Sequence, residues 1–453
     1  MHASENSSLL ERVDMGSVAR LAWPITVSML SYTLMGVVDT MFVGQLGTAE
    51  LAGVGLAITL AHLAQAFGWG LLSGLKVAAS QRFGANNAEA AGRLVWQGLW
   101  LSGLMGAAVA LLGPLGSPAF EVMGGTAATV AHADLFLRIR LLGAPLIFLT
   151  MALGAHFHGR GETRTPMVAT LLGNGVNILL DPVLIFGWWG LPALGVGGAA
   201  LATVLGFGVS AAFLAWRLAP VLRATDSALE LRWLREIWRL GGPMGLRGLL
   251  EVGSFTLFAA FLVQSGEAHL AAHVVVIRII SVSFLPGYAL GEAASVLVGQ
   301  AVGAGRPAVA RTAWWVSLQL ALVVMAVMGL AFFLAPDLLL EPFGATAEVR
   351  VVGRRLLAIA ALFQIFDAVA MVGLSALNGA GDTRFTMLVS VGSAWLVKLP
   401  LGYALALPAG LGAVGAWWGL TADIVFLAAA TLWRIQGAAW LEQPSPAEVA
   451  FAK

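Results

Sequence analysis

Cysteine is absent from all 453 residues, and charged side chains are scarce, at 11% of the chain. The first absence excludes disulfides and thiolate metal sites. An ordinary soluble domain carries about 25% charged residues, and these cover its surface. A chain of this length with so little charge cannot build such a surface, so the composition excludes an ordinary soluble protein.

Apolar residues take the place of that charge and make up 59% of the chain. Stretches of 18 or more apolar residues recur along its whole length, each long enough to cross about 30 Å of hydrocarbon as a helix. Helices satisfy their own backbone hydrogen bonds in lipid, and the alternating strands of an outer-membrane barrel are not seen. The sequence therefore predicts an all-α integral membrane protein with twelve transmembrane helices, which begin near Val18, Leu51, Leu94, Phe136, Pro166, Val196, Ile237, Leu270, Ala313, Leu356, Met387 and Leu411.

The basic residues test this count. With both termini inside, the inner loops and tails hold seventeen of the 25 Lys and Arg residues, the outer loops and adjoining helix starts hold five, and the spans hold three. The positive-inside rule requires such an excess on the cytoplasmic side. We therefore predict a multi-pass protein of the inner (plasma) membrane with both termini in the cytoplasm. The amino terminus lacks the features of a secretory signal, and a net charge of +1 gives no reason to expect nucleic acid as a partner.

The chain contains an internal repeat. Pro24 in "LAWPITVSML" recurs as Pro243 in "LGGPMGLRGL", 219 positions later, and "VAASQRFGA" recurs as "VLVGQAVGA" at the same shift. "GRGETRTPM" recurs as "GAGDTRFTM" at a shift of 220, and "LGVGGA" recurs as "LGAVGA" at 217. Six helices per half keep both halves in one orientation, so we predict two parallel six-helix repeats, an arrangement known from transporters.

The repeat also predicts the domain limits. We expect a cytoplasmic tail at residues 1–16, an N-terminal lobe at 17–218 and a C-terminal lobe at 240–436. A cytoplasmic linker at 219–239 would join the lobes, and a second cytoplasmic tail would occupy 437–453.

One span carries several polar residues on one face. In "GNGVNILLDPVLIFG", Asn174, Asn177 and Asp181 lie at i, i+3 and i+7, which spans about 10 Å of helix. A charge in mid-span costs at least about 2.5–3.5 kcal/mol, so the carboxylate needs a proton, a cation or a basic partner. The alternative interpretation is that Asp181 ends a helix before Pro182, because X-Pro disfavours the helical conformation.

The arrangement of these residues resembles the multidrug and toxic compound extrusion (MATE) family over about residues 15–433. The resemblance rests on Pro24 with "VVDTMFVGQLG", on "GRGETRTP" with "NILLDPVLIFG", and in the second half on Pro243 with Glu251, "LVGQAVGAGR" and "GAGDTR". It is closest to the DinF-like branch, with some NorM-like acids in the second half. It implies two six-helix lobes in a V-shaped bundle and a cation-coupled antiporter that alternates between inward and outward faces.

The resemblance also implies an ion site in the N-terminal lobe. Family aspartates matching Asp39 and Asp181, and an asparagine matching Asn177, form a cation or proton site, to which Asn174 and Thr203 are expected to add oxygens. Amide and carboxylate oxygens suit a hard cation such as Na⁺. The alternative for Asp39 is an interfacial residue beside the "GQLG" loop. Pro24 removes one backbone hydrogen bond and should let the first helix bend.

The second half has its own acids, Glu251 and Asp367. In the NorM-like branch, matching acids form a carboxyl-terminal Na⁺ site, but the tyrosine one turn before the second acid is Phe363 here, which removes one oxygen. Arg247 precedes Glu251 by four residues, so a structural ion pair is the alternative for Glu251.

Two more cations lie within spans, Lys398 and Arg278, and they are expected to balance Asp367 or each other. His269 and His273 have a metal-compatible spacing, but an interfacial role is favoured because no acidic ligand accompanies them.

With what the resemblance implies, these features predict a secondary antiporter that exports cationic, amphipathic organic compounds in exchange for H⁺ or Na⁺, without a cofactor and as a monomer. A P-loop is missing, which argues against ATP-driven transport. A lipid or oligosaccharide-lipid flippase of the same superfamily is the alternative, although it should need a basic cavity. An intramembrane enzyme is disfavoured because no H-E-x-x-H or G-x-S-x-G motif is present.

Overall fold

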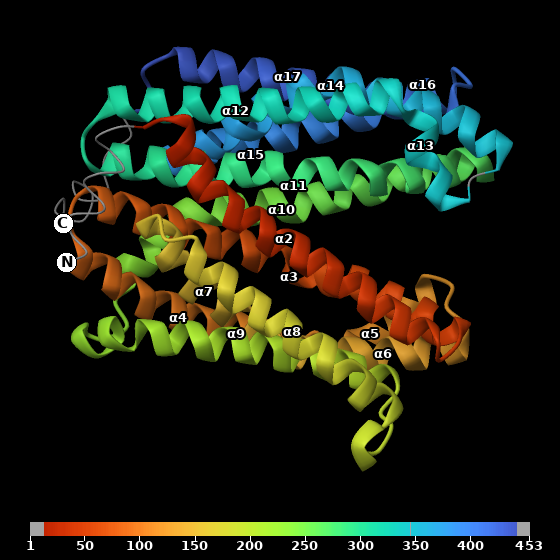
Figure 1. The fold of residues 1–453 in the computed structure, drawn as a ribbon, viewed down its shortest axis with the longest axis horizontal. Coiled ribbons are helices and arrows are strands. Elements are labelled where there is room, and N and C mark those ends of the chain that lie inside the picture. The colour runs from red at the N-terminus through yellow and green to blue at the C-terminus, as the bar shows by residue number, and fades with distance from the viewer. Residues whose placement is uncertain (1–12, 345, 442–453) are drawn as a thin grey trace. The chain divides into compact units, whose positions relative to one another are not determined.

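The computed structural model describes residues 13–344 and 346–441, which form helices without any β-strand (Figure 1). The first half contains α2 (Met15–Gly44), α3 (Thr48–Gly84), α4 (Ala88–Ala110), η1 (Gly113–Leu115), α5 (Gly116–Val122), α6 (Ala127–Leu142), α7 (Ala144–Arg160), α8 (Arg164–Phe186), η2 (Trp188–Gly190) and α9 (Val196–Ala224). The second half contains α10 (Leu231–Gln264), α11 (Glu267–Gly303), α12 (Pro307–Leu334), α13 (Pro336–Leu340), η3 (Glu341–Phe343), α14 (Ala347–Ala380), α15 (Thr383–Ser393), the π-helical turn η4 (Ala394–Lys398), α16 (Leu399–Ala406) and α17 (Gly412–Gln436).

The predicted all-α membrane fold with twelve spans is confirmed. Eleven segments are individually long and apolar enough to cross a membrane, and the pair α6 and α7 makes the twelfth. Several helices begin earlier than their apolar runs; the tenth span starts at Ala347 rather than near Leu356. Polar residues at a membrane surface extend a helix without adding hydropathy, so the apolar run marks only part of it.

The fourth span differs from the single helix expected from Phe136. It bends by 43° between α6 and α7, at Gly143. Pro145 stands in the first turn of α7, where its missing N–H is tolerated. A glycine followed closely by proline thus separates two helices within one continuous apolar run.

The repeat extends to the turns between helices. Residues with positive φ recur at matching positions of the two halves, at shifts of 217–220: Gly47 and Gly266, Asn86 and Gly305, Gly124 and Gly344, Gly161 and Gly381, and Gly195 and Gly412. Left-handed backbone is costly for most residues, so its recurrence in register indicates that both halves preserve one set of turns.

The described chain divides into two compact units, which we call the N-unit (residues 24–245) and the C-unit (residues 1–23 and 246–453). The chain passes from one unit to the other inside α2, at Pro24, and inside α10, two residues after Pro243. The predicted lobe limits remain predictions. The two predicted tails lie largely outside the described residues.

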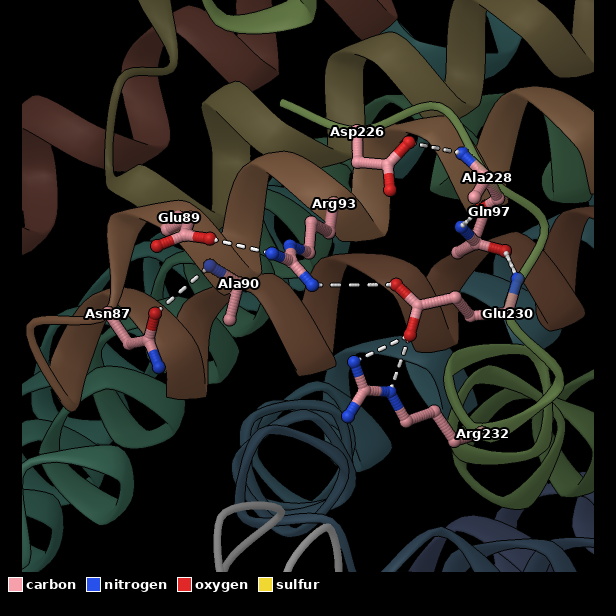
Figure 2. Close-up of polar contacts among 9 residues, drawn as sticks. All are labelled: Asn87, Glu89, Ala90, Arg93, Gln97, Asp226, Ala228, Glu230 and Arg232. Carbon is pink, nitrogen blue, oxygen red and sulfur yellow. Dashed lines mark hydrogen bonds and ion pairs between the residues drawn. The ribbon is translucent and has the colours of Figure 1, made fainter. Parts of the chain in front are cut away.

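The segment between α9 and α10 is fastened to α4 within the N-unit (Figure 2). Gln97 donates to the Ala228 carbonyl at 2.8 Å and accepts from the Glu230 backbone N–H at 3.1 Å. Arg93 reaches the Glu230 carboxylate at 3.6 Å, and Trp100 donates to the Ser227 carbonyl at 3.0 Å. Side chains of one helix therefore hold this connection in place.

Candidate functional site

The predicted N-terminal site residues come together from three helices of the N-unit. Asp39 lies on α2, Asn177 and Asp181 lie on α8, and Thr203 lies on α9. The side chains of Asp181, Asn177 and Thr203 all interact with Asp39. Asn177 and Asp181 are completely buried.

Close packing of α8 on α9 creates this geometry. A Cβ on Gly206 of α9 would lie 2.6 Å from the Gly173 carbonyl oxygen of α8, so only glycine allows the two backbones to approach so closely. The contact lies one turn before Asn177. The polar face of α8 is consequently held between α9 and the C-terminal half of α2.

Asp181 does not end its helix, as the alternative interpretation had it. Helix α8 continues through Pro182 to Phe186. Proline removes a backbone hydrogen bond without breaking the helix, which is tolerated where neighbouring helices surround the freed carbonyl. The carboxylate therefore lies within a continuous helix, about one and a half turns before its end.

The buried polar atoms of this cluster lack hydrogen bonds within the described chain. Both carboxylate oxygens of Asp181, both amide atoms of Asn177 and one oxygen of Asp39 make no hydrogen bond of good distance and angle among the described residues, and the contacts between these side chains and Asp39 are weaker polar ones. Buried polar side chains are rarely left so. These oxygens fit a proton or a small hard cation such as Na⁺, which takes oxygen ligands.

Thr203 and Asn174 have other partners. The Thr203 hydroxyl donates to the Ala199 carbonyl of its own helix at 3.0 Å, so its lone pairs remain free to face Asp39. Asn174 donates to Ser31 Oγ of α2 at 2.8 Å. Asn174 thus joins α8 to α2 one turn away from the cluster, rather than facing the two aspartates.

Arg140, one of the five basic residues that the sequence analysis assigned to the outer loops and adjoining helix starts, also belongs to this cluster. It is only 6% exposed and interacts electrostatically with Asp39. Its guanidinium lies 5.9 Å from the ring centre of Phe207, and two of its nitrogens are buried without a partner. The cluster therefore combines two carboxylates with one permanent positive charge.

The predicted acids of the second half separate into two sets. Glu251 pairs with Arg247, with Nε and Oε1 3.2 Å apart, which is the intrahelical ion pair given as the alternative. Asp367 interacts with Asp423 of α17, a residue that the sequence analysis did not single out. Phe363 is buried against Trp417 and offers no oxygen, as expected.

The remaining cations and histidines of the spans have defined surroundings. Lys398 is buried and interacts with Asp423 and Glu251, whereas Arg278 is exposed. His269 accepts from the Ala413 backbone N–H and His273 accepts from the Trp417 indole, both at 3.1 Å. These two histidines link α11 to the start of α17, so their spacing reflects packing.

The sequence matches the MatE family over residues 24–183 and 243–404. Among curated proteins it is 33% identical to the probable multidrug resistance protein NorM of Pseudomonas syringae pv. tomato, covering 92% of this chain and 94% of that protein. It is 29% identical to the protein of the same name from Thermotoga maritima, covering 90% and 89%.

Solved structures show the same fold. A MOP superfamily transporter from Pyrococcus furiosus, with a binding pocket of reverse polarity, superposes with a TM-score of 0.87 at 24% identity, over 96% of this chain and 98% of that one. A MATE structure in a straight conformation superposes with a TM-score of 0.86 at 25% identity, over 96% and 99%.

Proposed function

The chain belongs to the MatE family of membrane transporters, and we propose that it is a secondary antiporter that exports organic compounds in exchange for H⁺ or Na⁺. Its curated relatives carry the name multidrug resistance protein, which supports drugs as the exported class. A cluster of carboxylates suits cationic, amphipathic compounds best. We place the protein in the plasma membrane with cytoplasmic termini, acting as a monomer without a cofactor.

The observation that carries this proposal is the charge of the N-unit cluster. Asp39 and Asp181 supply two negative charges and Arg140 supplies one positive charge. The cluster therefore keeps one net negative charge. Oxygens of Asp181 and Asn177 that make no hydrogen bond of good geometry lie beside this charge. An unpaired buried charge is costly, so one proton or one Na⁺ completes the site.

Bending of α2 at Pro24 would link ion binding to substrate exchange. Asp39 lies on the same helix as Pro24, fifteen residues further along, while Asp181 lies on another helix. Bending α2 changes the position of Asp39 relative to Asp181, so the ion favours one bend. Exchange then requires that ion and substrate favour different states, because a ligand shifts an equilibrium only by its differential affinity.

Efflux of ethidium from inverted or reconstituted vesicles tests the proposal. With wild-type protein, an imposed H⁺ or Na⁺ gradient should drive efflux. Asp181→Asn keeps the shape of the side chain and removes its charge, so it should abolish the ion dependence. Asp226→Asn on the exposed connection before α10 is the matched control and should transport normally. Gradient-driven efflux by Asp181→Asn at the wild-type rate would refute the proposal.

A further inference from the structure

Lys398 is a buried cation in the eleventh span. Its side chain is 2% exposed, and it ends the π-helical turn η4 between α15 and α16. Single π-helical turns within helices are rare and frequently occur at functional sites. A desolvated ammonium is costly unless it is compensated, so its surroundings should show what compensates it.

The ammonium is held in place by α10. Nζ donates to Ser254 Oγ at 2.9 Å and lies 3.9 Å from the ring centre of Phe255. Trp395, in the same π-helical turn, donates to the Leu250 carbonyl at 3.3 Å. These contacts join the eleventh span to the seventh and fix the position of the charge.

Two carboxylates lie within electrostatic range of this charge, and neither forms a direct ion pair with it among the described residues. Lys398 interacts electrostatically with Asp423 and with Glu251, at longer range than the contact between Glu251 and Arg247. Asp423 is 6% exposed and accepts a hydrogen bond from Ser393. Each of these acids thus has a cation supplied by the chain.

The repeat places Lys398 in the helix that corresponds to the helix of Asp181. The shift between the halves changes from 220 before this helix, at "GRGETRTPM", to 217 after it, at "LGVGGA", so Lys398 lies within three positions of the residue that matches Asp181. At the shift of 217 that holds after the helix, Asp423 corresponds to Gly206, the close contact between α8 and α9. The fifth helix of one half therefore carries an acid, and that of the other carries a base close to the matching position.

We propose that Lys398 is the built-in cation of the C-unit. Its ammonium, held by Ser254, supplies to the carboxylates of Asp423 and Glu251 the positive charge that a bound Na⁺ would otherwise supply. The C-unit consequently binds no coupling ion of its own, and the N-unit cluster alone selects and carries the ion. This inference rests on the proposed antiport and names the unit that couples it.

The test removes the built-in charge and asks whether Na⁺ replaces it. Purified full-length Asp39→Asn protein is the parent, because its N-unit cluster retains one carboxylate and one guanidinium and needs no added ion. Lys398→Gln is introduced into this parent. Melting temperatures are then compared in sodium chloride and choline chloride at equal ionic strength.

Lys398→Gln should gain a Na⁺-dependent rise of about 3 °C at a Na⁺ concentration near 100 times its dissociation constant, because a bound ion stabilises the folded state. The parent and a Lys398→Arg variant, which keeps the charge, should show no such rise. Adding Asp423→Asn to Lys398→Gln should remove it.

Three results would overturn the inference. These are no Na⁺ effect in Lys398→Gln, a Na⁺ effect in the parent that Asp423→Asn removes, and equal loss of folded protein in Lys398→Gln and Lys398→Gln/Asp423→Asn. The last result would mean that Lys398 acts only by packing. A different result would contradict the antiport proposal itself, namely gradient-driven ethidium efflux that persists in Asp39→Asn.

Discussion

Removing both aspartates of the N-unit cluster should leave a buried arginine without a counter-charge. Asp39→Asn or Asp181→Asn alone leaves one carboxylate for Arg140, so the cluster becomes neutral and no longer requires an ion. The double variant leaves only the positive charge, on a side chain that is 6% exposed. The two single variants and the double variant should therefore differ in stability although all three lose ion-driven efflux.

The size of this difference follows from the burial of Arg140. Breaking a buried charge pair by removing one partner costs about 3–5 kcal/mol. Arg140 and Asp39 interact electrostatically, and no direct ion pair joins their described side chains, so we expect the lower end, about 3 kcal/mol, for the double variant. Each single variant should change the free energy of unfolding by about 1 kcal/mol or less, in the range of an ordinary substitution.

Adding Arg140→Gln to the double variant supplies the decisive comparison. The triple variant has no charge left in the cluster and should recover most of the lost stability, which thermal unfolding of the purified protein measures. Efflux should remain uncoupled in all of these variants, and the double variant should be no worse than the worse single one. The reasoning fails if the double variant is as stable as the singles, or if Arg140→Gln brings no recovery.

Three further predictions concern other parts of the chain. Pro24→Ala restores a backbone hydrogen bond to α2 and should slow exchange several-fold while ion binding persists; wild-type exchange and unchanged helix motion would contradict this. Arg82 and Glu236 form a buried ion pair of 2.8 Å between α3 and α10, so Arg82→Gln should cost about 3–5 kcal/mol of stability, and adding Glu236→Gln should recover much of it in thermal unfolding; equal loss in both would show that the pairing is irrelevant. A single cysteine at Thr126 should react with an impermeant reagent from outside and one at Ser227 should not, and the reverse pattern would exclude cytoplasmic termini.

The helices of this protein could be predicted from sequence because hydropathy is a local property. A run of apolar residues spans the membrane wherever its neighbours lie, and proline and glycine mark its ends or bends. The bend at Gly143 escaped prediction because the apolar run continues across it. The branch within the family, DinF-like or NorM-like, also remains a prediction.

Charges are different because their meaning depends on packing. Arg138 and Arg140 are two residues apart in "LFLRIRLLG", yet Arg138 is half exposed and pairs with Asp134 at 2.7 Å, whereas Arg140 is buried near Asp39. Two residues that are two positions apart point to nearly opposite sides of a helix. They therefore face different neighbours, which the sequence does not identify. Asp423 carried a usable signal, since an ionisable residue within a span is itself a functional hypothesis.

The charge of the two units also predicts the electrical character of transport. If the N-unit cluster takes one H⁺ or Na⁺ and Lys398 keeps the C-unit free of ions, each monovalent cationic substrate is exchanged for one positive charge. Such exchange moves no net charge, so a membrane potential imposed with K⁺ and valinomycin should leave the ethidium efflux rate unchanged at a fixed ion gradient. A second ion bound in the C-unit would make each cycle carry one net charge, and moving one charge through 100 mV is worth about 2.3 kcal/mol. Acceleration of wild-type efflux by such a potential would therefore contradict the one-ion cycle, whereas potential dependence that arises only in Lys398→Gln would show that this lysine sets the number of ions.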